Sequence, residues 1–475
     1  MKFRWRRIVI GLITVVVVSL AIPVGKELID RSKAREDLNR IISELDRTDP
    51  RWRLEDVELD RHAVPDESNS AVTVTAAHRL LPKKWEPKID AELEKIPPPI
   101  ALRKDQADKL AGELKSLEDA LQTARKLKDQ PIGSTKLNYT PDFLSTLVPH
   151  LQPPREVASL LVMDVTLSLD RKDMEKAWIS NRALLNTGRS IGDEPLLISI
   201  LVRFAIDELA VRNLERALGQ GEFKETHLEE RQRAFGTEME VPHFLIGMRG
   251  ERAGTDHMLS NIENGTISLL RTLNNVGKKK KSDSSSIWDQ INEFLAFSMV
   301  LRSHATLLDL QTRLIEAIKL APKERNQAVK EVEAAFKQIA PDDKSQILVR
   351  LLFPSVTKMA QAEQRIHTKL ACAIAGIGAE RFRLKKNRWP DSLEELVQAG
   401  CLKEIPIDLF DGNPLRFRRT NDGLVIYSPG LGGFYDGKAL DDLGNVNENV
   451  IRVEFRLWDP SQRRQTPLPP KGDKQ

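Results

Sequence analysis

Hydrophobic and polar residues follow a helical spacing through most of this chain. Apolar residues recur every three or four positions in many stretches, which is typical of helices with one buried face. These stretches are 26–46, 70–81, 102–127, 155–169, 172–188, 194–218, 224–238, 287–319 and 323–339. Within 102–127 the spacing predicts one long amphipathic helix whose buried stripe is Leu110, Leu114, Leu117 and Leu121. The pattern therefore predicts a mainly α fold with a helical body. A helical-hairpin arrangement is one alternative for that body.

Near the C-terminus a further helical pattern runs from Ala360 to about Leu384. Gly376 and Gly378 interrupt it, and each glycine costs a helix about 1 kcal/mol relative to alanine. We therefore expect another segment to pack closely against that face. Pro390 disfavours helical backbone at the residue before it, so the helix should end near this point.

The pattern then changes from helix to strand. Ser392 and Glu395 have the spacing of a capping box, which predicts a short helix that Gly400 closes. Beyond it, Thr420-Asn421-Asp422-Gly423 lies between two apolar runs, as in a hairpin with positive-φ turn residues. Apolar and charged residues alternate from Ile451 to Leu457, which predicts a strand with one buried face. A small α+β module with antiparallel strands is expected at 360–458.

The order of these motifs resembles the globular end of the major pseudopilin of bacterial type II secretion systems. The matching stretches are 380–384, 387–390, 392–396, 408–415, 427–430 and the acidic loop 436–442. In that family a cleaved glycine precedes a hydrophobic helix with an early glutamate, and the N-terminus here has no such pattern. The resemblance covers about a fifth of the chain and does not extend to assembly of a fibre through the N-terminal helix.

The resemblance implies a calcium site in the acidic loop. The residues that it points to are Asp436, Asp441 and Asp442. Carboxylate and carbonyl oxygens gathered on one loop suit a hard cation. The alternative is a solvated acidic turn that keeps a sheet edge soluble.

The N-terminus carries a different signal. Four cations (Lys2, Arg4, Arg6 and Arg7) precede residues 8–24, a run of 17 apolar or small residues without charge. This pattern predicts a signal-anchor helix in the lipid bilayer, with its N-terminus inside and the bulk of the chain outside the cytoplasmic membrane. Ser19-Leu20-Ala21 offers a signal-peptidase site, and cleavage after Ala21 would instead release a soluble exported form. Both alternatives export the body.

The length of 475 residues favours several domains. We divide the chain into a signal-anchor helix (1–25), a juxtamembrane helical region (26–100), an α-helical body (101–359), the pseudopilin-like module (360–458) and a disordered tail (459–475). A formal net charge of +4, dispersed along the chain, does not indicate nucleic acid. Cys372 and Cys401 could pair outside the cytoplasm, but we favour two buried free thiols because Cys372 lies within a helix.

No motif of this sequence indicates a reaction. The eight histidines lack zincin spacing, and Asp256-His257, which could orient an imidazole, has no nucleophile-elbow serine or cysteine with it. We expect a non-catalytic binding or scaffold protein of the bacterial envelope, with a protein partner on the helical body or the C-terminal sheet edge. Two alternatives remain: an accessory component of a type II secretion or pilus-like apparatus, and an envelope hydrolase whose site gathers distant residues.

Overall fold

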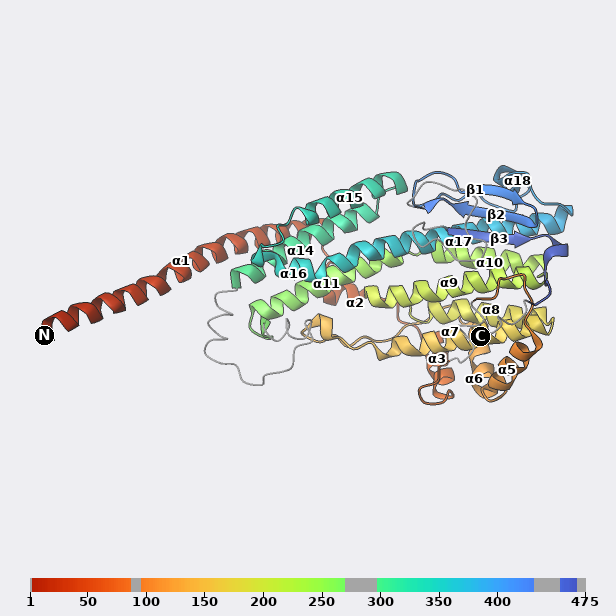
Figure 1. Ribbon diagram of the computed structural model, residues 1–475, viewed down its shortest axis with the longest axis horizontal. Coiled ribbons are helices and arrows are strands. Elements are labelled where there is room, and N and C mark those ends of the chain that lie inside the picture. Colours follow the sequence, from red (N-terminus) through yellow and green to blue (C-terminus); the bar gives the residue numbers. More distant parts are fainter. Residues whose placement is uncertain (1, 87–94, 270–296, 431–452, 468–475) are drawn as a thin grey trace, which may run out of the picture.

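The computed structural model describes residues 2–86, 95–269, 297–430 and 453–467, with the side chains of 2–23, 344 and 354–357 left aside. The fold is mainly α-helical with a small antiparallel sheet near the C-terminus, as the sequence predicts. Figure 1 shows long helices running side by side along an elongated body. The sheet lies at one end, and α1 extends beyond the other helices at the opposite end.

The helical elements cover the first four fifths of the described chain. They are α1 (Lys2–Thr48), α2 (Leu54–Leu59), α3 (Ser70–Arg79), α5 (Lys104–Lys115), α6 (Glu118–Arg125), η1 (Lys126–Asp129), η2 (Phe143–Ser145), η3 (Pro149–Leu151), α7 (Gln152–Asp170), α8 (Met174–Arg189), α9 (Leu197–Gln220), α10 (Glu225–Glu240), α11 (His243–Glu263), α14 (Phe297–Ile318), α15 (Pro322–Lys337), η4 (Lys344–Gln346), α16 (Ile347–Leu352) and α17 (Pro354–Lys386). After α17 follow α18 (Leu393–Gln398), β1 (Arg416–Thr420), β2 (Gly423–Ser428), β3 (Val453–Trp458) and η6 (Pro460–Gln462).

The centre of the body is built by α7, α8 and α9, which pack on one another. Their facing side chains are fully buried, among them Leu160, Leu184 and Leu214. The predicted helices 155–169, 172–188, 194–218 and 224–238 correspond to α7 through α10 and are confirmed. Helix α11, which packs against α9 and α14, was not predicted.

The single long helix predicted at 102–127 is wrong, because the chain breaks it into α5 and α6. Leu117 leaves the helical region at φ −114° and ψ 14°, and the Ser116 hydroxyl donates to the Glu113 carbonyl at the end of α5. The predicted leucine stripe is nevertheless buried throughout. The bend lets α5 pack on α7 while α6 contacts both α3 and α7. Periodicity therefore identified the buried face but not the change of direction.

The C-terminal module is a three-stranded antiparallel sheet, in the order β1-β2-β3, packed on α17. The predicted hairpin is confirmed, with Thr420 opposite Gly423, although neither Asn421 nor Asp422 has positive φ. The predicted alternation in the last strand is confirmed too, since Val453, Phe455 and Leu457 of β3 are buried.

Both helix glycines of the module serve close packing, as expected. A Cβ at Gly376 would lie 2.3 Å from the Phe455 ring, and one at Gly378 would lie 2.9 Å from the Cys401 carbonyl oxygen. The buried core is continuous from α2 through the body to β3. The sheet is therefore fixed to the body through α17.

The short helix after Pro390 is confirmed as α18, and Gly400 after it has φ +65°. The capping box is wrong: the Ser392 side chain makes no cap hydrogen bond. The Glu395 carboxylate instead accepts from the backbone N–H of Asp391 at 2.8 Å and pairs with Arg388. The nearby guanidinium holds the Glu395 side chain away from the cap position.

The segment after β3 is not a disordered tail where the structure describes it. Arg463 is buried and pairs with Glu380 of α17 at 2.9 Å, and the Gln465 N–H donates to the Pro99 carbonyl at 2.7 Å. Residues 459–467 therefore join the sheet to the body. The rest of the predicted tail, 468–475, lies outside the described residues.

Helix α1 has two halves with different surroundings. From Glu27 onward it packs on α14: the Glu27 carboxylate accepts from the N–H and hydroxyl of Ser298 at 2.8 and 2.7 Å. A small apolar core of Ala34, Leu38, Leu45, Trp52, Leu301, Ala305 and Leu308 continues this contact. The first half projects from the body (Figure 1) and contains residues 8–24, whose side chains are not described before Val24. Within the region searched, which is the described part of the chain, no helix is sufficiently long and apolar to cross a bilayer.

A buried histidine joins α14 to α11 and, through α11, to α1. His304 lies 2.7 Å from Glu263 and 3.1 Å from Asp256, and Arg35 of α1 pairs with the other Glu263 oxygen at 2.7 Å. Burial opposes protonation of His304, but its hydrogen bonds with Asp256 and Glu263 outweigh that effect and raise its pKa. Asp256 therefore orients His304 rather than its neighbour His257, whose ring nitrogen lies 3.8 Å from Glu55.

Gly376→Ala is expected to lower the free energy of unfolding by about 1–3 kcal/mol, because the new methyl group overlaps the buried Phe455 ring. Gly236→Ala in α10 is the matched control. Nothing lies within 4 Å of a Cβ there, so this substitution should stabilise the helix by about 0.5–1 kcal/mol. Urea denaturation followed by circular dichroism measures both, and equal gains in the two variants would contradict the close packing.

The His304 contacts should make stability depend on pH. The folded-state pKa lies above the unfolded value of 6.5, so the imidazolium stabilises fully below pH 6.5 and this contribution is lost as pH rises through the folded-state pKa. His304→Gln should therefore destabilise by about 2 kcal/mol at pH 6 and by less at pH 9. His257→Gln is the control, since the His257 ring nitrogen lies 3.8 Å from Glu55, beyond hydrogen-bond distance. A loss for His304→Gln that is the same at both pH values would contradict the charged state.

Candidate functional site

A cavity of about 330 Å³ opens between α8 and α10. We call it the arginine pocket. Helix α8 contributes Trp178, Arg182, Leu185, Asn186 and Arg189, α10 contributes Glu230, Arg231 and Ala234, and the chain at the end of η1 contributes Lys128, Asp129 and Pro131. Four cations and two carboxylates thus line the pocket together with an indole ring.

Local sequence explains why these side chains converge. Trp178, Arg182 and Arg189 stand four and seven positions apart on α8, a spacing that places them on one helix face. Helix α8 begins at the Asp173 cap, whose carboxylate accepts from the Lys176 N–H at 3.0 Å. The Asn186 amide donates to the Leu127 carbonyl at 2.8 Å and fixes η1 against the same face.

Three of the four cations already have carboxylate partners. Arg182 pairs with Glu230 at 2.7 Å, and Lys128 pairs with Asp129 at the rim. Deeper in the wall, Arg189 pairs with the buried Glu238 at 2.8 Å and donates to the Ala234 carbonyl at 2.7 Å. Each of these three cations therefore contacts a carboxylate of the protein.

Arg231 is the exception. It is only 2% exposed, and its hydrogen bond of 2.6 Å goes to the neutral side-chain oxygen of Asn181. Its Nε has no hydrogen-bond partner, and no carboxylate of the described residues pairs with its guanidinium. The guanidinium lies 5.3 Å from the ring centres of Trp178 and Phe235, and those aromatic faces partly compensate the charge.

The electrostatics of Arg231 follow from this isolation. Burial, and after it the charge of Arg189, lowers the pKa of Arg231 to about 9. The guanidinium therefore still carries its charge at neutral pH. A buried cation without a counter-ion is costly to a fold, and the cavity beside it is where an external anion could supply the missing charge.

A second layer of buried charges holds the pocket wall. The Glu238 carboxylate accepts from Arg189 on one oxygen and from Arg203 of α9, at 2.6 Å, on the other. Burial disfavours the charged form of Glu238, but Arg203, His243 and Arg189 outweigh it and hold its pKa well below the usual range. Burial and the charge of Glu238 raise the pKa of nearby Asp207 well above its usual value. The two arginines are therefore locked in place by one carboxylate.

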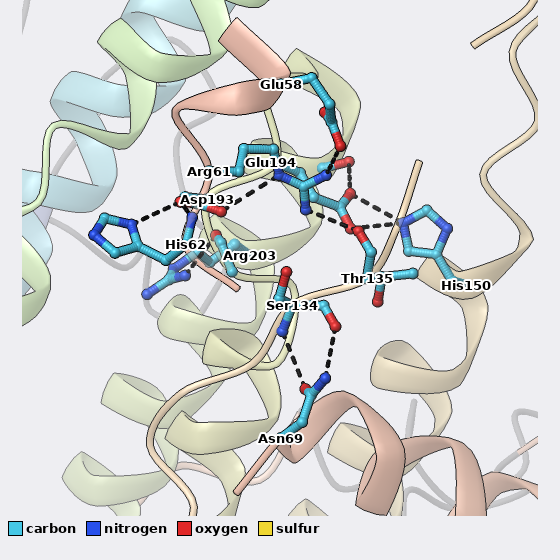
Figure 2. A network of polar contacts seen from close by, with 12 residues as sticks. Glu58, Arg61, His62, Asn69, Ser134, Thr135, His150, Asp193, Glu194 and Arg203 are labelled. Carbon is cyan, nitrogen blue, oxygen red and sulfur yellow. Dashed lines mark hydrogen bonds and ion pairs between the residues drawn. The ribbon is translucent and has the colours of Figure 1, made fainter. Parts of the chain in front are cut away.

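Behind Arg203 the polar contacts continue into the network of Figure 2. Arg203 donates to the Gly192 carbonyl at 3.0 Å, next to Asp193 and Glu194 in the α8–α9 loop. Arg61 lies 3.4 Å from Asp193 and donates to the Thr135 carbonyl at 2.8 Å. The Asn69 side-chain amide donates to the Ser134 carbonyl, and its oxygen accepts from the Ser134 backbone N–H. This network ties the extended chain that leaves the pocket at Pro131 to the loop at the end of α8.

The same network brings a serine, a carboxylate and a histidine together, but not in a nucleophilic arrangement. Ser199 donates to Glu194 at 2.6 Å, and His150 lies 2.9 Å from the same carboxylate. In a hydrolytic triad the imidazole stands between the hydroxyl and the carboxylate. Here the carboxylate stands between them, and both Ser199 and Glu194 are fully buried. These hydrogen bonds instead fix the α8–α9 loop, through Glu194, to His150 and to Ser199.

The residues expected to bind calcium, Asp436, Asp441 and Asp442, lie outside the described residues. Within the described ranges no three His, Cys, Asp or Glu side chains gather as a metal would need. Cys372 and Cys401 are free, buried thiols, as we favoured. Burial raises the pKa of the Cys372 thiol, which keeps it protonated and unreactive.

Sequence reasoning missed the arginine pocket. The signal available was the spacing of Trp178, Arg182 and Arg189 on one predicted helix. Charged residues with this spacing usually indicate a solvent-exposed helix face, and the sequence does not show that α10 packs against it. Arg231 gave no signal at all, because nothing in the sequence separates a buried arginine from the exposed Arg233 two positions later.

Comparisons with known proteins add no relative: no protein-family model, curated protein or solved structure matches this chain. The function has to be argued from the geometry.

Two arginines of the pocket should respond in opposite ways to substitution. Arg189→Met leaves Glu238 short of one buried partner and should lower the free energy of unfolding by about 3–5 kcal/mol. Arg231→Met removes a buried charge without a counter-ion and should leave stability unchanged or raise it by up to about 2 kcal/mol, since the losses are the bond to Asn181 and the contacts with the rings of Trp178 and Phe235. Chemical denaturation of the ligand-free protein measures both. A similar large loss for Arg231→Met would make that residue structural.

Proposed function

We propose that this chain is a membrane-tethered binding protein of the bacterial cell envelope, whose arginine pocket holds an anionic ligand outside the cytoplasm without transforming it. The observation that carries the binding function is Arg231, a charged side chain buried beside a cavity with its Nε unbonded. Proteins retain such a destabilising group where a ligand uses it.

The tether rests on α1 and its sequence. The uncharged run 8–24 would span about 26 Å as a helix, close to the hydrocarbon thickness of a bilayer. The four preceding cations favour a cytoplasmic N-terminus. Among the described side chains of α1, Glu27 bonds Ser298 of α14 three residues after the end of the apolar run. This arrangement supports a body held directly against the outer face of the membrane.

Binding rather than hydrolysis is supported by the cluster around Glu194. Its serine and its carboxylate are buried away from solvent, and its histidine contacts the carboxylate instead of the hydroxyl. The hydrolase alternative would need a reactive hydroxyl facing a cavity. The arginine pocket offers charge and an aromatic wall but no hydroxyl or thiol among its lining side chains.

A second candidate function is an accessory role in a type II secretion or pilus-like apparatus. It is supported by the packing of α17 on the antiparallel sheet, which is the type of module that the pseudopilin resemblance implies. The sheet order leaves β1 as an edge strand for a protein partner. At the other edge of the sheet, the backbone N–H of Arg456 in β3 donates to the Glu215 carboxylate of α9 at 2.9 Å.

Site-directed labelling tests the topology. Leu147 is 83% exposed, so Leu147→Cys should react with a membrane-impermeant maleimide in intact spheroplasts. Wild type should stay unlabelled, because both native thiols are buried. Lys2→Cys should react only after the membrane is permeabilised. Labelling of Leu147→Cys that requires permeabilisation would place the body in the cytoplasm and contradict the envelope location.

A further inference from the structure

We propose that the arginine pocket recognises a monocarboxylate carried on a small apolar or aromatic body, as found in a free carboxylic acid or at the C-terminal residue of a peptide. This inference rests on the proposed function, in that it names the chemical class of the anion that Arg231 binds. Charge, hydrogen-bond geometry and wall composition each lead to it.

The pocket and its wall carry an excess of positive charge. Lys128 and Arg182 are balanced by Asp129 and Glu230, while Arg189 shares the single charge of Glu238 with Arg203. Among the cations that line the pocket, Arg231 has no carboxylate partner within the described residues, so the anionic group of a ligand would bind there.

The chemistry of the Arg231 guanidinium also suits a carboxylate. One terminal nitrogen of its guanidinium is engaged by Asn181, while Nε is unbonded. A guanidinium presents its donors in a planar fork that matches the two oxygens of a carboxylate. Because the carboxylate would meet this fork in a buried site, its hydrogen bonds would be worth more than at the protein surface.

The walls and the size of the cavity define the rest of the ligand. Trp178, Leu185, Ala234 and Pro131 supply apolar surface beside Arg231. A volume of about 330 Å³ is at the lower end of the range for ligand pockets, which limits the bound part to a small acid or one terminal residue. The second layer around Glu238 keeps the wall in place before the ligand arrives.

Isothermal titration calorimetry of the full-length protein in detergent tests this inference. The probes are phenylacetate, the uncharged isostere phenylacetamide, inorganic phosphate and sulfate, and N-acetylalanylphenylalanine as a peptide terminus. We expect phenylacetate to bind at least tenfold more tightly than phenylacetamide, phosphate or sulfate. The relative affinity of the acetylated dipeptide distinguishes a free acid from a peptide terminus as the natural source.

Substitutions assign the binding to the pocket. Arg231→Met should abolish phenylacetate binding, and Arg231→Lys should weaken it about tenfold because the charge remains while the fork is lost. Arg233→Met, on the exposed face of the same helix, is the matched control and should bind as wild type does.

The possible failures are distinguishable. Preferential binding of phosphate or sulfate that depends on Arg231 would overturn the carboxylate class and leave an anion-binding pocket. Equal binding of phenylacetate and phenylacetamide would overturn recognition of charge. Failure of every probe to bind would overturn both this inference and the proposed binding function.

Discussion

The pairing of one buried carboxylate with two arginines is the interaction on which the site depends. Glu238 on α10 bonds Arg189 on α8 and Arg203 on α9, so three helices meet at a neutralised group in the core. A buried ion pair stabilises only while its geometry is complete. Because Glu238 is fully engaged by these two residues, it is not available to the third arginine, Arg231, about two turns earlier on the same helix. The charge left over is a consequence of how the core is paired.

The same principle governs the attachment of α1. Glu27 bonds Ser298 of α14, and Arg35 pairs with Glu263 of α11. These polar contacts lie beside a short apolar core that includes Leu38 and Leu301. This core is separate from the main one. Helix α1 is thus held to the body by an interface with an apolar and a polar part. The polar part includes His304, whose pKa is raised.

The parts of the fold that could be predicted from the sequence are those whose physical signal lies within one helix or strand. Apolar periodicity identified α7 to α10 and the buried face of α5 and α6, since each signal lies within one helix. Alternation and a glycine-containing turn identified the hairpin and β3 for the same reason. The site was not predicted. Whether Arg189 is paired, or Arg231 is buried, depends on a neighbouring helix 40 to 50 positions away, and no pattern along one helix reports that.

The ordered segment after β3 bears on how the molecule is assembled. Arg463 donates to the Gly221 carbonyl and Arg464 to the Leu169 carbonyl, contacts that span 242 and 295 positions of the chain. Helices α7 and α9 can form early during synthesis, but the carbonyl groups that bond this segment do not meet these arginines until it emerges from the ribosome. Contacts of such long separation slow folding and leave intermediates exposed to misassociation. The body therefore completes its hydrogen bonds only after this last described segment of the chain has been synthesised.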